Sequence, residues 1–178
     1  MNFKLYLESR RQMAIVSGIT LLLMAIVAGI GFGYAFNSFY SYDSPKITLA
    51  KLQDMPAQLD LLIYAFVAVL ILDILVSFSF YFFFKNNRPK LSLTTCIIRL
   101  IYSIILGYSI LQLFQLKGLL IQGELDLDGL DYLESFLNTW SMGLIVFGIH
   151  LTMLGILFLQ TGDTPKWTSV LMIFAGIS

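Results

Sequence analysis

Long apolar runs separated by short polar segments organise this chain. Four of them, over about residues 13–36, 61–84, 91–116 and 136–160, exceed the ~20 residues that an α-helix needs to cross the ~30 Å hydrocarbon core of a bilayer. A fifth run begins at Trp167 and reaches Ser178, and at ~1.5 Å per residue it rises only about 18 Å. We therefore expect an all-α polytopic transmembrane helix bundle, with four full spans, an incomplete fifth span and residues 1–178 as a single transmembrane domain.

The polar segments between the runs predict turns and one further helix. Residues 86–89, with the sequence NNRP, predict a tight turn that places Pro89 in the first turn of the third span, and Pro165 begins the fifth run in the same way. Between the third and fourth spans, leucines recur at spacings of three and four while acidic residues occupy the other faces, which predicts a short helix at the outer interface. The leucines are Leu127, Leu130, Leu133 and Leu137, and the acidic residues are Asp128, Asp131 and Glu134.

Small residues recur every fourth position in the first span, at Ala25, Gly29 and Gly33. A ridge of this kind lets two helix backbones approach closely. We expect it to make a helix contact inside the bundle.

The composition agrees with a membrane protein, because 58% of the 178 residues are hydrophobic and only 12% are charged. Eleven basic and eleven acidic residues give a net charge of zero, which argues against nucleic acid as a partner. The one cysteine, Cys96, lies inside an apolar run, so an intrachain disulfide is excluded. The expected surroundings are the lipid bilayer.

The placement of lysine and arginine predicts the orientation. With the N-terminus in the cytoplasm, seven basic residues fall inside and three outside, which is a positive-inside bias. The first apolar run is longer than a signal-peptide core of ~7–15 residues and lacks a small-residue cleavage site, so we expect a retained anchor. The inner residues are Lys4, Arg10, Arg11, Lys85, Arg88, Lys90 and Lys166, and the outer ones are Lys46, Lys51 and Lys117.

Three ionisable residues remain inside the spans: Asp73, Arg99 and His150. An Asp or Arg at the centre of a span costs roughly 2.5–3.5 kcal/mol on insertion scales, so each should face protein or water. Counted from the inner ends of their spans, all three fall at about 12–17 Å depth. The second and third spans form a tight hairpin, and we expect a buried Asp73–Arg99 pair. His150 needs a partner from another helix.

Arg99 has polar neighbours on its own helix face, including Tyr102 and Ser103 at offsets of three and four. The candidate binding residues are therefore Asp73, Arg99, His150, Tyr102 and Ser103. One histidine and one aspartate are too few ligands for zinc, and we expect no metal ion and no cofactor.

These residues leave three functional hypotheses open. In the first, an inner-leaflet pocket binds a small or lipid-like ligand or relays protons, with Arg99 holding an anionic group, Asp73 orienting Arg99 and His150 titrating or donating a hydrogen bond. In the second, the same pocket is the site of a lipid-modifying or hydrolytic enzyme with His150 as general base. In the third, the charged groups only clamp the helices of a structural or partner-binding subunit.

Several short motifs give the chain a resemblance to a known family. They are Arg11 with the following MAIVSG, Asp73, Arg99-Leu100, GIHLTMLG over 148–155 and PKW over 165–167. On these the chain resembles the bacterial membrane family called domain of unknown function 4386. The resemblance implies a multi-pass helical protein of the bacterial inner membrane, typically with six spans and no settled activity. Here Thr168-Ser169 stand where that family often has Leu-Gly, and the sequence ends at Ser178.

Overall fold

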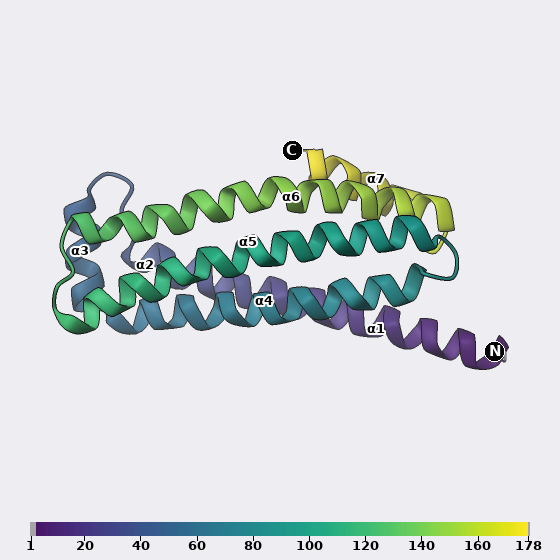
Figure 1. Cartoon of the computed structure of the whole chain (residues 1–178), viewed down its shortest axis with the longest axis horizontal. Coiled ribbons are helices and arrows are strands. Elements are labelled where there is room, and N and C mark those ends of the chain that lie inside the picture. Colours follow the sequence, from purple (N-terminus) through teal and green to yellow (C-terminus); the bar gives the residue numbers. More distant parts are fainter. Residues whose placement is uncertain (1–2, 178) are drawn as a thin grey trace. The chain divides into compact units, whose positions relative to one another are not determined.

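The computed structural model describes residues 3–177, with side chains from Arg10 onward, and every regular element in that part of the chain is a helix. The predictions made for Lys4 and Ser178 lie outside this range, because the side chain of Lys4 and the whole of Ser178 are not described. The elements in order are α1 (Phe3–Ala28), the π-helix η1 (Gly29–Phe36), α2 (Asn37–Phe39), α3 (Pro45–Asp54), α4 (Pro56–Phe84), α5 (Pro89–Gln122), the 3₁₀ turn η2 (Asp128–Leu130), α6 (Asp131–Thr161) and α7 (Lys166–Ile177) (Figure 1). The all-α prediction is confirmed.

Four of the helical segments are long and apolar enough to cross a membrane: Arg10–Phe39, Pro56–Phe84, Pro89–Gln122 and Asp128–Thr161. The four predicted spans lie inside these segments and are confirmed. The helices continue past the apolar runs into more polar sequence at the start of α4, the end of α5 and the start of α6. Because length and apolar composition agree over all four segments, the chain is an integral membrane protein.

Prolines and glycines set the helix boundaries. Pro45, Pro56 and Pro89 each occupy a first turn, where the missing N–H leaves no bond unmade. Gly123 follows α5 with φ +74°, and Gly162 follows α6 with φ +68°, a conformation that only glycine adopts readily. After α5 the N–H groups of Gly123 and Glu124 bond to the carbonyls of Leu120 and Leu119, which is a Schellman ending.

Two features of the outer loops differ from the sequence prediction. The leucine-rich segment is not a separate interfacial helix, because η2 leads directly into α6 and the first turns of α6 bury Leu133 and Phe136. Between the first and second spans, the ten-residue helix α3 forms, and no helix is predicted there from the sequence. Two of the acidic residues of the leucine-rich segment, Asp131 and Glu134, lie in the first turn of α6, where a carboxylate interacts favourably with the helix dipole.

The described residues form two compact units, and several helices contribute to both. Unit 2 comprises Leu23–Ile71 and Ile105–Ser141. Within it, the small-residue contact of the first span is made by Gly31, because a Cβ there would lie 2.5 Å from the Cβ of Ala65. A Cβ on Gly29 or Gly33 would meet nothing within 4 Å, so the predicted ridge is wrong. Gly29 and Gly33 both lie in the π-helix η1, which departs from the α-helical geometry that the spacing argument assumes, and within it Gly31 is the glycine that approaches Ala65.

Unit 1 comprises the chain up to Leu22, Leu72–Ile104 and the segment from Met142. Here α7 runs back along α6 (Figure 1), and the two backbones touch at glycines. A Cβ on Gly148 would lie 2.6 Å from the carbonyl oxygen of Gly176, and a Cβ on Gly155 would lie 2.8 Å from that of Ser169. Unit 1 contains all five residues predicted from the sequence to form a site.

Candidate functional site

Three helices of unit 1 bring the ionisable residues to one level. Asp73 lies 11 residues before the end of α4, Arg99 lies 10 residues after the start of α5, and His150 lies 11 residues before the end of α6. Since consecutive helices alternate in direction, these counts place all three about 15–17 Å from the same end of the helices. The exposed fractions of the three residues are 0%, 1% and 1%.

The guanidinium of Arg99 joins the other two groups. Its Nη2 lies 2.6 Å from Oδ1 of Asp73, and its Nη1 lies 2.9 Å from Nε2 of His150. The predicted Asp73–Arg99 pair is confirmed, and the partner that His150 needed from another helix is Arg99. The three residues form what we call the buried network.

Donor and acceptor roles in the buried network follow from the chemistry of arginine. A guanidinium can only donate, so Nε2 of His150 accepts. The proton of the imidazole is then on Nδ1, which donates to the carbonyl oxygen of Thr95 at 3.0 Å. Both ring nitrogens are thereby used within the protein, and the tautomer is fixed by its two partners.

The other two predicted site residues flank the network on α5. The hydroxyl of Ser103 donates to Oδ2 of Asp73 at 2.5 Å, so both carboxylate oxygens have a donor nearby. The ring of Tyr102 packs against Phe147 with centroids 5.1 Å apart, and Cζ of Arg99 lies 5.3 Å from the same Phe147 ring. Phe147 was not singled out from the sequence, because its place beside a cation depends on how α5 and α6 pack.

The buried network can act as a clamp on α4, α5 and α6. Its arginine and carboxylate balance each other, and a neutral imidazole adds no net charge, which a low-dielectric setting requires. Among the described residues, the two ring nitrogens of His150 bond to Arg99 and to the carbonyl oxygen of Thr95, and neither bonds to a hydroxyl or thiol. The hydroxyl of Ser77 lies 3.3 Å from the thiol of Cys96 and donates to the carbonyl oxygen of Cys96 at 3.2 Å. This geometry gives the enzyme hypothesis no support.

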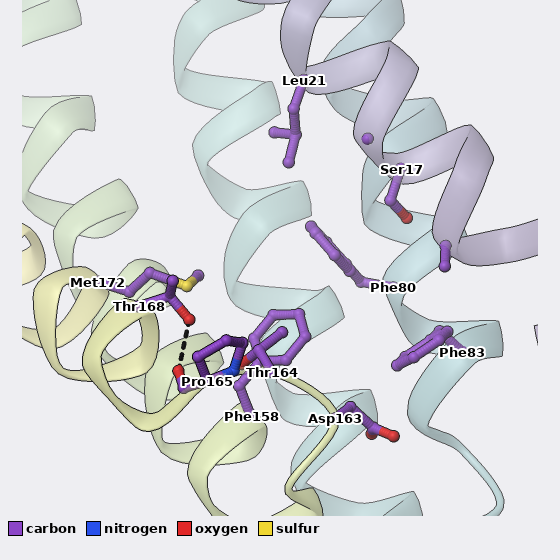
Figure 2. A pocket seen from close by; sticks show the side chains of 12 residues that line it. Ser17, Leu21, Phe80, Phe83, Phe158, Asp163, Thr164, Pro165, Thr168 and Met172 are labelled. Carbon is purple, nitrogen blue, oxygen red and sulfur yellow. Dashed lines mark hydrogen bonds between the residues drawn. The ribbon is translucent and has the colours of Figure 1, made fainter. Parts of the chain in front are cut away.

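A separate cavity of about 400 Å³ lies in unit 1, and none of the five predicted residues lines it. Figure 2 shows its walls, which come from α1, α4, the end of α6 and the start of α7. The lining residues are Ala14, Ser17, Gly18, Leu21, Phe80, Phe83, Phe158, Asp163, Thr164, Pro165, Thr168 and Met172.

Small residues on α1 create this space. Ala14, Gly18 and Leu21 follow one another at spacings of four and three, so they share a helix face. A Cβ on Gly18 would meet nothing within 4 Å. The hydroxyl of Ser17 is turned to Ser79, to which it donates at 2.8 Å, so it leaves the wall largely apolar.

Charged residues mark one end of the cavity. Nη2 of Arg10 lies 2.9 Å from both carboxylate oxygens of Asp163, which lines the cavity. Cζ of Arg10 also lies 4.5 Å from the centroid of Phe83, another lining residue. Leu21 comes 11 residues after Arg10 on α1, so the cavity reaches about 16 Å from its charged end into apolar surroundings. We call Arg10 and Asp163 the mouth pair.

Sequence reasoning missed the cavity. In the sequence, Arg10 is only one of the predicted cytoplasmic charges. Ala14 and Gly18 belong to an apolar run in which nothing distinguishes them from other span residues. The available signal was the face shared by two small residues and a serine, but a space appears only when the opposing Phe80 and Phe158 are in place. Among residues 3–177, no group of three or more His, Cys, Asp or Glu side chains is placed to hold a metal ion.

Comparisons with known proteins show a family but no activity that could be compared with this site. The profile of a family described as "Domain of unknown function (DUF4386)" matches residues 16–178. A protein of Archaeoglobus fulgidus described as "Uncharacterized protein" is 27% identical over 108 residues, which cover 61% of this chain and 56% of that protein. The chain thus spans little more than half the length of this relative. No solved structure matches the chain.

Proposed function

The chain belongs to the family called domain of unknown function 4386, and from that premise we propose that it is a multi-pass protein of the bacterial cytoplasmic membrane that binds a lipid-like ligand in the cavity of unit 1. Residues 1–178 form one transmembrane domain in this proposal. The N-terminus lies in the cytoplasm, which puts the charged end of the cavity at the cytoplasmic face of the membrane. The bilayer itself supplies the ligand.

The observation that carries the proposal is the shape of the cavity, with an apolar interior and a charged mouth. Its volume of about 400 Å³ falls in the range of ~300–1,000 Å³ that is usual for ligand sites. An amphiphile places its tail in apolar surroundings and its headgroup in polar ones. The apolar interior of the cavity suits the tail, and the charged mouth suits the headgroup. A polar metabolite would leave its hydrogen bonds unmade against Phe80, Phe158 and Met172.

The buried network has a positioning role in this proposal. Asp73 and Phe80 are seven residues apart on α4, and His150 and Phe158 are eight apart on α6, so each pair shares a helix face two turns apart. By holding α4 and α6 to Arg99, the network fixes the distance between two aromatic walls of the cavity. In this role Arg99 acts on the ligand through other residues and does not touch it.

The test fills the cavity from the one position where a side chain has room. Gly18→Leu places a side chain in the space where a Cβ meets nothing, and we expect lipid that co-purifies with the protein in detergent to fall at least about tenfold, as measured by native mass spectrometry. Gly118→Leu is the matched control, because a Cβ at that helical glycine also meets nothing within 4 Å. Equal lipid retention by the two variants would contradict the proposal.

A further inference from the structure

The mouth pair lies at the charged end of the cavity and is partly exposed to solvent. About a fifth of each side chain is exposed, 19% for Arg10 and 20% for Asp163. Exposed ion pairs of this kind contribute little to stability because water screens them. The guanidinium also lies over the ring of Phe83, and stacking of this kind keeps an arginine in place when its anionic partner changes.

We propose that the ligand is an anionic phospholipid of the cytoplasmic leaflet, whose phosphate takes the place of the Asp163 carboxylate on Arg10 while one acyl chain fills the cavity. This inference rests on the proposed function. It adds the class of lipid, the residue that selects it and the residue that competes with it.

The chemistry of Arg10 favours a phosphate. A guanidinium presents a planar fork of donors that can bind two oxygens of a carboxylate or a phosphate. In this structure one nitrogen of Arg10, Nη2, contacts both carboxylate oxygens of Asp163, at 2.9 Å each. A phosphodiester offers the same pair of oxygens with the same charge. A zwitterionic headgroup carries its own cation beside the phosphate, so it gains less from an additional arginine.

The surroundings of the mouth add positive charge. Arg11 is exposed next to Arg10, and Lys166 is exposed three residues after Asp163. Basic residues close to the cytoplasmic surface attract anionic lipids by roughly additive contributions. Once a phosphate binds Arg10, the nearby lysine and arginine compensate the charge of the displaced carboxylate.

The depth of the cavity agrees with one leaflet. The distance from Arg10 to Leu21 along α1 is about 16 Å, and half of a ~30 Å hydrocarbon core is ~15 Å. A lipid with its phosphate at Arg10 would therefore bring the middle and end of one acyl chain to Gly18, Leu21 and Met172, the apolar part of the lining.

The experiment compares two variants that break the same ion pair. The purified full chain is placed in nanodiscs or detergent with phosphatidylglycerol or phosphatidylcholine of identical acyl chains, and each bound lipid is counted by native mass spectrometry. The wild type should prefer phosphatidylglycerol by about tenfold. Arg10→Gln should reduce the preference to within about twofold while an acyl chain still binds, because the cavity is unchanged.

Asp163→Asn should act in the opposite direction. Asp163→Asn removes the carboxylate that competes with the phosphate for Arg10, so binding of phosphatidylglycerol should rise by about three- to tenfold and that of phosphatidylcholine should stay the same. A merely structural ion pair predicts equal losses from both variants. Lys46→Gln is the matched control for the loss of one positive charge, because Lys46 is exposed in α3 of unit 2 and does not line the cavity. It should change the preference by less than about twofold.

The outcomes separate this inference from the proposed function. Retention of the preference by Arg10→Gln, or weaker phosphatidylglycerol binding by Asp163→Asn, would overturn the inference while lipid binding stands. Arg10→Lys covers the case in which Arg10→Gln fails to fold, and it should give an intermediate preference because lysine keeps the charge and loses the fork. If neither lipid binds and Gly18→Leu only dissociates a dimer, a second copy fills the groove, and both proposals fail.

Discussion

At the scale of single residues, Arg99 is the centre of unit 1. It lies between a carboxylate and an imidazole, with 1% of its surface exposed, and it contacts one residue on each of two other helices. Removing one charge from such a pair leaves the other uncompensated in a low-dielectric setting, and this costs more than the pair gains. The network therefore fixes which helices pack together more than it adds net stability.

A double-mutant cycle tests this account of the network. We expect Asp73→Asn to lower the free energy of unfolding by about 3–5 kcal/mol because the buried Arg99 cation loses its carboxylate partner, and Arg99→Gln to have a comparable effect. The double variant should recover much of that loss, since neither charge remains. Unfolding by sodium dodecyl sulfate in mixed micelles gives the measurement.

The Asp60–Lys117 pair of unit 2 is the control for the cycle, with N and O atoms 2.6 Å apart and 38% and 27% of the side chains exposed. Asp60→Asn should have a much smaller effect because water can solvate Lys117. If the losses in the Asp73 and Arg99 variants simply added, the two charges would not be acting as a pair.

The sequence predicted part of this site for a clear physical reason. Buried charges inside a membrane need partners, and the short turn between the second and third spans limits where the partner of Asp73 can lie. Arg99 could therefore be predicted as that partner. The partner of His150 could not be predicted, because its identity depends on the rotation of α6 about its axis. The cavity beside Gly18 could not be predicted, because no residue type in a sequence marks an empty space between helices.

At the scale of elements, the apolar runs predicted the four spanning helices but not their ends or their local geometry. Helices α4, α5 and α6 extend beyond the apolar runs because Pro56, Gly123 and the start of α6 at Asp131 set the boundaries, and hydrophobicity does not. The π-helix η1 changes which residues share a face. A periodicity argument assumes 3.6 residues per turn, and it fails where the turn is wider.

Alanine substitutions in η1 test the close approach inside unit 2. Gly31→Ala puts a Cβ 2.5 Å from that of Ala65, and we expect the free energy of unfolding to fall by about 1–3 kcal/mol from overpacking. Gly33→Ala, in the same π-helix, is the matched control, because its Cβ meets nothing within 4 Å. We expect this control to be neutral or slightly stabilising. Equal effects of the two substitutions would show that Gly31 does not approach Ala65.

At the scale of the whole molecule, the part of the chain that the structure describes contains four helical segments long and apolar enough to cross a membrane, which is typical of an integral membrane protein. Many large apolar side chains are exposed, including Leu22, Ile104 and Ile145, and in a bilayer these contact acyl chains at no cost. The sequence predicts a membrane protein from composition and run length alone, and the lengths of the described helices agree with that prediction. In the proposed function, the cavity distinguishes one lipid contact from the rest, because an acyl chain bound there would be surrounded by protein.

The most direct measurement of the central claim is photo-labelling with a phosphatidylglycerol that carries a diazirine near the end of one acyl chain. After irradiation in vesicles and digestion, mass spectrometry locates the labelled peptides. We expect labelling to concentrate at Gly18, Leu21 and Met172 and to disappear from them in Gly18→Leu, because the added side chain occupies the space of the lipid tail. Labelling spread evenly over exposed apolar residues such as Ile104, and unchanged in Gly18→Leu, would contradict the account.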